Sequence, residues 1–341
     1  MLKNYRPWGQ IDWLLDHSSL TKTTFIGCLS VELRCVEAAK CFSRRYGDTV
    51  DFHFSLIKDP IANNVELTKK KVDLSTQALE DSLGFSSQID EFELFCPPLD
   101  ISDYIFDLVK SSESVVLDIT CMPKRFFFIA VKAILESDVK DFLVTYSLPE
   151  SYCNNEELSG DPDDLEALPF FAGTENEEGL QELLLGIGHS ELGLIGALEE
   201  SAKNLNLHVL FPFPPGPPSI EKNWRFMRSV QALSFKNLPV DPIRVSASNV
   251  SDAFDHMVNI TNGGSQPAVL APYGPKPMSL AMCLYAIHTN SKVVYTQPRS
   301  YSPNYSHGAG KTDDGSPATN AYWICLNGEN LYFKSEEAAD G

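Results

Sequence analysis

The sequence has no run of 18 or more apolar residues and no excess of basic side chains. Without such a run, no membrane-spanning helix is expected. The first eight residues lack the apolar segment of a secretory leader, so we expect a cytoplasmic protein. The 341 residues carry 46 acidic and 27 basic side chains, a formal charge of −19. Because nucleic-acid backbones are gripped by basic surfaces, duplex nucleic acid is excluded as an expected partner, although a few local donors can still hold a small anion.

Signatures of catalysis and of metal binding are also missing. No Cys-x-x-Cys pair, His-Glu-x-x-His motif or Gly-x-Ser-x-Gly elbow occurs, and the eight cysteines are expected to be reduced core residues. The segment Gly186–Glu191 begins like a dinucleotide fingerprint, but Glu191 stands where the third glycine belongs, and a carboxylate there opposes a pyrophosphate. We therefore expect no metal and no cofactor, and we identify no catalytic residue.

The sequence does contain an internal duplication of one pattern. Each copy has a glycine turn after a short apolar strand, then a Pro-Lys turn after a buried strand, and finally a tyrosine beyond another strand. The matching positions follow in the same order at a nearly constant offset: Gly27 and Gly186, Glu32 and Glu191, Lys124 and Lys276, and Tyr152 and Tyr301. This duplication predicts two like units related by a pseudo-twofold axis, with a shared site where they face each other.

Strand-like and helix-like segments alternate along each copy. That order is typical of an α/β fold, here two tandem Rossmann-like units with mainly parallel sheets. The near-continuous apolar run at 114–120 is typical of a strand that is buried on both faces of such a sheet. We expect unit 1 at residues 1–153, an acidic linker at 154–167 and unit 2 at residues 168–341.

Ligands of open parallel sheets bind beyond the carboxyl ends of the strands, and this rule selects four turns. The glycine turns can expose backbone amides, and the helix starts supply free N–H groups and positive potential that suit phosphate or carboxylate. In unit 1 the candidate ligand-binding residues are Gly27, Ser30, Glu32, Asp118, Thr120, Lys124 and Arg125. In unit 2 they are Gly186, His189, Ser190, Glu191, Tyr273, Lys276 and Tyr301.

Several of these residues also have a purely structural interpretation. Ser30 and Ser190 either donate to a ligand or cap a helix. Glu32 and Glu191 either accept bonds from a ligand, pair with a neighbour such as Arg34, or complement a helix dipole. The tyrosines either stack on a base or pack in the core. A lysine at the start of a helix opposes the dipole, so for the two lysines a ligand role is the favoured interpretation.

The stretch from Val115 to Lys124 resembles the fourth-strand motif of the CRISPR-associated Rossmann-fold (CARF) superfamily, in which a hydrophobic strand ends in Asp-x-Thr before a lysine. The turn from Gly27 to Ser30 resembles the first ligand-binding loop of that family. Two such units in one chain are similar to the SAVED domain. The usual glycines are replaced by Cys121-Met122-Pro123, and Leu270 stands where the second unit would have the aspartate.

This resemblance implies a sensor of oligonucleotide second messengers in bacterial antiviral defence, with Ser30, Thr120, Lys124 and Lys276 as ligand contacts. We accordingly expect a sensor or regulator that binds a nucleotide-like anionic small molecule between its halves. No effector segment is left over, so a protein partner or a homo-oligomer is expected to carry the signal. The alternatives are an enzyme acting on a phosphorylated or nucleotide substrate, and an interaction scaffold with a degenerate pocket.

Overall fold

The computed structural model describes residues 5–61, 64–84, 89–153, 158–174, 181–201, 205–214, 220–232 and 241–333. The chain divides into two compact units. Unit 1 comprises Met1–Leu158 together with Ser300–Gly341, and unit 2 comprises Ser159–Arg299. The expected boundary at 168–341 is therefore wrong for the last forty or so residues, because the chain returns from unit 2 to complete the sheet of unit 1.

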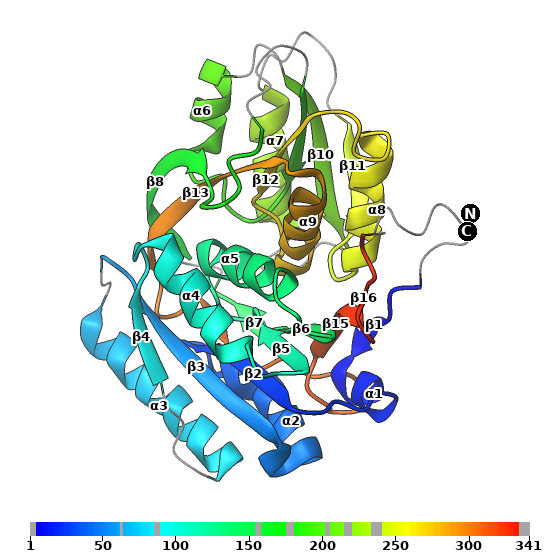
Figure 1. Cartoon of the computed structure of the whole chain (residues 1–341). Helices are drawn as coiled ribbons and strands as arrows, with labels where there is room; N and C mark the ends of the chain where they lie inside the picture. Colours follow the sequence, from blue (N-terminus) through cyan, green and yellow to red (C-terminus); the bar gives the residue numbers. More distant parts are fainter. Residues whose placement is uncertain are drawn as a thin grey trace, which may run out of the picture. The chain divides into compact units, whose positions relative to one another are not determined.

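Unit 1 is built on a parallel sheet in the order β4-β3-β2-β5-β6 (Figure 1). The strands are β2 (Thr23–Leu29), β3 (Val50–Lys58), β4 (Ile89–Glu93), β5 (Ser114–Asp118) and β6 (Asp141–Ser147). Counted along the chain this is the order 3-2-1-4-5, in which the direction of winding reverses between β2 and β5. All residues of β2 and β5 are buried, as expected for central strands covered on both faces.

Helices cover both faces of this sheet (Figure 1). Helices α2 (Glu37–Tyr46) and α3 (Val65–Leu83) pack together on one face, and α4 (Pro98–Val109) and α5 (Lys124–Leu135) pack together on the other. The core on the first face is aromatic, with Phe25 against Phe42 and Phe52 at ring-centroid distances of 5.6 and 5.4 Å. A short 3-10 turn, Leu33–Val36, precedes α2.

The returning segment extends this sheet with antiparallel strands. β15 (Thr319–Leu326) pairs with β6, β1 (Trp8–Gln10) pairs with β15, and β1 leads into the short helix α1 (Ile11–Asp16). β16 (Glu329–Asn330) closes a hairpin with β15. Its two turn residues, Asn327 and Gly328, have φ values of 53° and 82°, the left-handed conformations of a type I′ turn.

Unit 2 repeats the same order. Its sheet runs β11-β10-β9-β12-β13, again 3-2-1-4-5 along the chain and again parallel in every one of these pairs. The strands are β9 (Gln181–Gly186), β10 (Leu205–Phe213), β11 (Pro242–Ser246), β12 (Ala268–Pro272) and β13 (Lys292–Tyr301). They alternate with helices α6 (Leu194–Ser201), α7 (Ile220–Ala232), α8 (Val250–Ile260) and α9 (Lys276–Thr289). The expected fold class, two tandem Rossmann-like units, is confirmed by this shared strand order.

The acidic stretch is not a linker where it is described. Residues 154–157 lie outside the described part, but Ser159–Ala167 forms β8, the strand next to β13 at the edge of the second sheet. Asp163 forms an ion pair with Arg299. Acidic side chains suit an edge strand because they discourage pairing with another chain, so a composition typical of a linker here belongs to a strand.

Candidate functional site

The direction of winding reverses between β2 and β5 in unit 1, and between β9 and β12 in unit 2. In open parallel sheets, ligands bind beyond the carboxyl ends of the strands at such a reversal. The four turns selected from the sequence are the four turns that follow these strands. The topology therefore places the candidate residues of these four turns near the carboxyl ends of the two central strands of their own sheet, whereas Tyr301 lies outside these turns. What each residue does there differs from one turn to the next.

In unit 1, Asp118 and Thr120 form a fully buried brace. Thr120 donates its hydroxyl to Asp118 Oδ1 at 2.5 Å and accepts the backbone N–H of Ser147 at 2.9 Å, while Thr145 donates to the same Oδ1 at 3.0 Å. The brace ties the end of β5 to the end of β6. These bonds fix the turn that leads into α5, so both residues support the edge from inside the protein.

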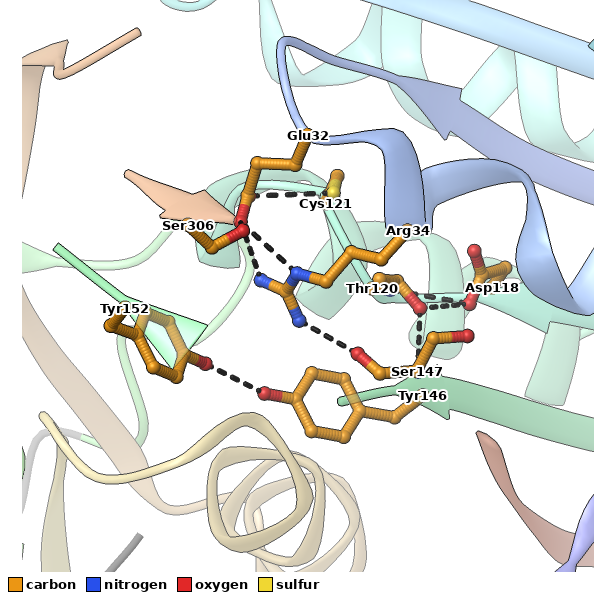
Figure 2. A network of polar contacts seen from close by, with 9 residues as sticks. All are labelled: Glu32, Arg34, Asp118, Thr120, Cys121, Tyr146, Ser147, Tyr152 and Ser306. Atoms are coloured by element: carbon orange, nitrogen blue, oxygen red, sulfur yellow. Dashed lines mark hydrogen bonds and ion pairs between the residues drawn. The ribbon is translucent and has the colours of Figure 1, made fainter. Parts of the chain in front are cut away.

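A second network lies beside this brace and joins the turn after β2 to the returning segment (Figure 2). Arg34 pairs with Glu32 Oε2, with Nε and Nη2 each 3.0 Å away, and donates from Nη1 to the carbonyl oxygen of Ser147 at 2.7 Å. Ser306 donates its hydroxyl to the same carboxylate oxygen, and Cys121 donates to Glu32 Oε1 at 3.4 Å. Of the alternatives for Glu32, the structure shows the pair with Arg34.

Aromatic rings enclose the guanidinium. Arg34 lies 5.7 Å from the ring centroids of both Tyr146 and Tyr152, whose hydroxyls are 3.2 Å apart. Tyr305 packs edge-on against Tyr152 at 5.8 Å. The exposed fractions of Glu32 and Arg34 are 8% and 2%, so the pair is held in a low-dielectric setting with cation–π support.

The pKa shifts in this cluster keep its guanidinium, thiol and phenol groups in their ordinary protonated forms. Burial alone would lower the pKa of Arg34, but the Glu32 carboxylate and the nearby hydroxyls raise it well above its ordinary value. Burial raises the pKa of the Cys121 thiol, helped by its hydrogen bond with Cys35 and by Glu32. Burial likewise raises the pKa values of Tyr152 and Tyr305. A thiol and phenols kept neutral are poor nucleophiles and bases, so the arrangement stabilises the edge rather than activating a group.

The remaining candidates of unit 1 lie around this cluster. Gly27 is inside β2, where a Cβ atom would come within 2.6 Å of the Phe54 ring, so packing explains this glycine. Ser30 is half-buried just beyond β2. Lys124 and Arg125 are half-buried in the first turn of α5, and Arg125 lies over the ring of Phe95 at 5.6 Å.

In unit 2 the turns after β9 and β12 touch through their backbones. A Cβ atom on Gly188 would overlap the carbonyl oxygen of Tyr273, and one on Gly186 would lie 2.9 Å from the sulfur of Met278. Asn223 of α7 donates its Nδ2 to the carbonyl oxygen of Gly188 at 2.8 Å. The glycines that suggested a ligand loop therefore have a packing role.

Tyr273 is an internal brace of unit 2. Its hydroxyl lies 2.7 Å from Thr296 Oγ1 and accepts the Thr296 backbone N–H at 3.0 Å, and burial raises its pKa to about 12. His189, Ser190 and Glu191 are half-buried between β9 and α6. Lys276 is half-buried as the first residue of α9.

Tyr301 is the last residue of β13 and lies in the segment Ser300–Gly341, which belongs to unit 1. Its backbone N–H donates to Asp59 Oδ2 at 2.9 Å, and Lys71 of α3 holds the next residues through the carbonyl oxygen of Pro303 at 2.6 Å. Burial raises the pKa of Asp59 to about 6.

Sequence reasoning missed Ser306 and the role of Cys121. Ser306 is 274 residues from Glu32, and no local pattern indicates that these two side chains meet. Within the described residues no helix is long and apolar enough to cross a membrane, and no group of three or more His, Cys, Asp or Glu side chains is placed to hold a metal ion.

No family model and no curated protein matches this sequence. Solved structures align over most of the chain, but with low scores. A Listeria monocytogenes protein, provisionally assigned as a UDP-N-acetylglucosamine 2-epimerase, has 10% identity and a TM-score of 0.25 over 85% of this chain and 93% of its own. MurG of Acinetobacter baumannii has 13% identity and a TM-score of 0.21 over 83% of this chain and 87% of its own. Scores this low carry no argument about function, so the assignment to the tandem Rossmann-like class rests on the strand order of the two units.

Proposed function

We propose that the protein is a sensor or regulator that binds a nucleotide-like anionic small molecule at the carboxyl edges of its sheets. The observation that carries this proposal is the start of α5 and of α9. Each helix follows the fourth strand of its unit, has a proline with no side-chain capping bond as its N-cap, begins with a lysine, and has no acidic residue in its first turn.

Such a helix start favours an anion and disfavours a lysine. The first backbone N–H groups have no partner inside the helix, and the dipole places partial positive charge at this end. A cation there costs about 0.3–1 kcal/mol, and Arg125 adds a second cation to α5. A bound phosphate or carboxylate would reverse the sign of this term and satisfy the N–H groups, which supports a ligand role for Lys124 and Lys276.

Binding rather than catalysis is the function that the described residues favour. The buried cluster of unit 1 contains an ion-paired, protonated arginine and protonated thiol and phenol groups, none of which is activated for proton or group transfer. A signal then requires an element whose state the ligand changes, and a protein partner or a second copy of the chain remains our proposal for it. The role in antiviral signalling implied by the CARF resemblance stays a prediction.

Thermal unfolding with a panel of mononucleotides, dinucleotides and cyclic nucleotides tests the proposal. We expect at least one member to raise Tm, because a ligand that binds only the folded state stabilises it. Lys124→Ala and Lys276→Ala should each weaken binding about tenfold to hundredfold, from the loss of charged hydrogen bonds of about 1.5–3 kcal/mol.

Lys132→Ala is the matched control, since Lys132 lies at the other end of α5 and pairs with Glu136. It should leave binding unchanged. A panel in which no member shifts Tm would refute the proposal, as would binding that survives the double replacement of Lys124 and Lys276. Consumption of the nucleotide during the assay would favour an enzyme instead.

A further inference from the structure

Unit 2 exposes an apolar surface at the carboxyl edge of its sheet, which we call the α7 surface. It comprises Phe213 at the end of β10, Ile220 and Trp224 on α7, and Arg244 on β11. The exposed fractions of the three apolar side chains are 50%, 52% and 46%. Large side chains gathered in this way at one edge, on a protein of high net charge, indicate a binding surface more than an accident of packing.

The two aromatic rings of this surface, Trp224 and Phe213, each contact a neighbouring side chain. Trp224 packs against the buried Phe211 at a centroid distance of 5.4 Å, and the guanidinium of Arg244 lies 5.4 Å from the ring centroid of Phe213. The opposite side of α7 is buried through Phe226 and Met227, which anchors the helix on the sheet. Trp224 is therefore a preorganised flat surface, and little ordering entropy is lost when another ring stacks on it.

The local charge is opposite to that of the whole chain. Besides Arg244, the exposed part of α7 carries Arg225 and Arg228. Its acidic residue, Glu221, forms an ion pair with Arg225, with Oε1 and Nη2 3.6 Å apart. In a chain of formal charge −19, a surface that combines exposed rings with arginines fits an aromatic anion, since arginine holds phosphate oxygens while rings stack on a base.

The helix that carries this surface also contacts, through its buried side, the turn in which the sequence predicts an anion site. Asn223, next to Trp224, holds the carbonyl oxygen of Gly188 at 2.8 Å, and Phe226 packs edge-on against Tyr273 at 6.0 Å. Helix α7 thus contacts both the turn after β9 and the turn after β12.

We propose that the α7 surface is the base-binding part of the unit 2 site, where a nucleobase stacks on Trp224 and Phe213. The phosphate of the same nucleotide lies toward the start of α9. This inference rests on the proposed function and specifies it further, because it says which part of the ligand unit 2 recognises through rings. Every base has an aromatic face, so stacking alone gives affinity for all four bases with little preference among them.

Calorimetric titration of the full chain with adenosine, guanosine, cytidine and uridine 5′-monophosphates, compared with ribose 5-phosphate, tests the inference. We expect the nucleotides to bind and ribose 5-phosphate to bind roughly ten- to hundredfold more weakly, the fold-change expected from the loss of one stacked base. Trp224→Ala should weaken nucleotide binding by the same factor and leave ribose 5-phosphate unchanged. Trp224→Phe should restore most of the affinity, since a ring is again present.

Trp13→Ala is the matched control, because Trp13 is similarly exposed at 52% but lies in unit 1. Nucleotide binding that is indifferent to Trp224→Ala would overturn the base-binding role and leave the proposed function standing. A chain that binds neither nucleotides nor ribose 5-phosphate would overturn both. Self-association in sedimentation that Trp224→Ala abolishes, with nucleotide affinity unchanged, would assign the α7 surface to a second copy and overturn the inference.

Discussion

Replacing Arg34 with methionine removes the cation at the centre of the buried cluster of unit 1. The variant loses the two contacts with Glu32 Oε2 at 3.0 Å, the bond to the Ser147 carbonyl oxygen at 2.7 Å, and the contacts with two tyrosine rings. It also leaves the Glu32 carboxylate, 8% exposed, without its counter-ion. Breaking a buried pair in this way costs about 3–5 kcal/mol of the free energy of unfolding.

The double variant Glu32→Gln/Arg34→Met removes both charges and should recover more than half of this loss. Replacing a buried pair as a whole is often near neutral, because the desolvation penalty disappears together with the attraction. Lys40→Met is the control, because it breaks an ion pair in a more exposed place. Lys40 Nζ lies 2.7 Å from Glu37 Oε1, and the lysine side chain is 37% exposed. This replacement should cost less than about 1 kcal/mol.

Urea unfolding followed by tryptophan fluorescence measures these differences in unit 1 alone if Trp224 is first replaced by phenylalanine. The remaining tryptophans, Trp8, Trp13 and Trp323, all belong to unit 1. A shift of the unfolding midpoint at constant slope reports the change in stability. A loss below about 1 kcal/mol in Arg34→Met, or a double variant as unstable as the single, would refute the view of a desolvated and mutually dependent pair.

Three further replacements test other parts of the structure. Gly188→Ala should destabilise unit 2 by several kcal/mol, because its Cβ atom would overlap the Tyr273 carbonyl oxygen. Gly196→Ala on α6, where a Cβ atom meets open space, should be neutral or slightly stabilising. Equal denaturant midpoints for the two variants would contradict the packing role of Gly188. Burial raises the pKa of Asp59 from 3.8 to about 6, so the folded state holds this proton more tightly than the unfolded state does. The contribution of this group to the free energy of unfolding is therefore complete below about pH 4 and is lost as the pH rises through about 6. Asp59→Asn should flatten the dependence of stability on pH in this range. An unchanged dependence would exclude Asp59 as its cause. Thr120→Val removes a hydroxyl with two buried partners and should lower the free energy of unfolding by about 1–3 kcal/mol, and a neutral result would argue against the brace.

The fold was largely predictable because its signals are local. Fully buried central strands such as Ser114–Asp118 are near-continuous apolar runs, and the turns after them carry the Pro-Lys pairs that revealed the duplication. The edge strand Ile89–Glu93 gives a weaker signal, because none of its residues is fully buried. The acidic strand Ser159–Ala167 was mistaken for a linker because its pairing, not its composition, makes it a strand.

The candidate site was predictable only in part, for a related reason. The sequence indicates which turns end the central strands, and the topology brings those turns together. The sequence does not indicate that Ser306 donates a hydrogen bond to Glu32, or that the Tyr273 backbone leaves no room for a side chain at position 188. Both contacts join segments that are distant in the sequence. Long-range pairing of this kind depends on the whole fold, whereas strand and helix signals depend on neighbours in the chain.

The most direct test of the proposed function is to locate a bound nucleotide in crystals grown with a ligand that raises Tm. Our proposal predicts electron density for its phosphate against the first turn of α5 or α9, within hydrogen-bonding distance of Lys124 or Lys276. Density for the nucleotide at any other place, with both helix starts occupied by water alone, would contradict it.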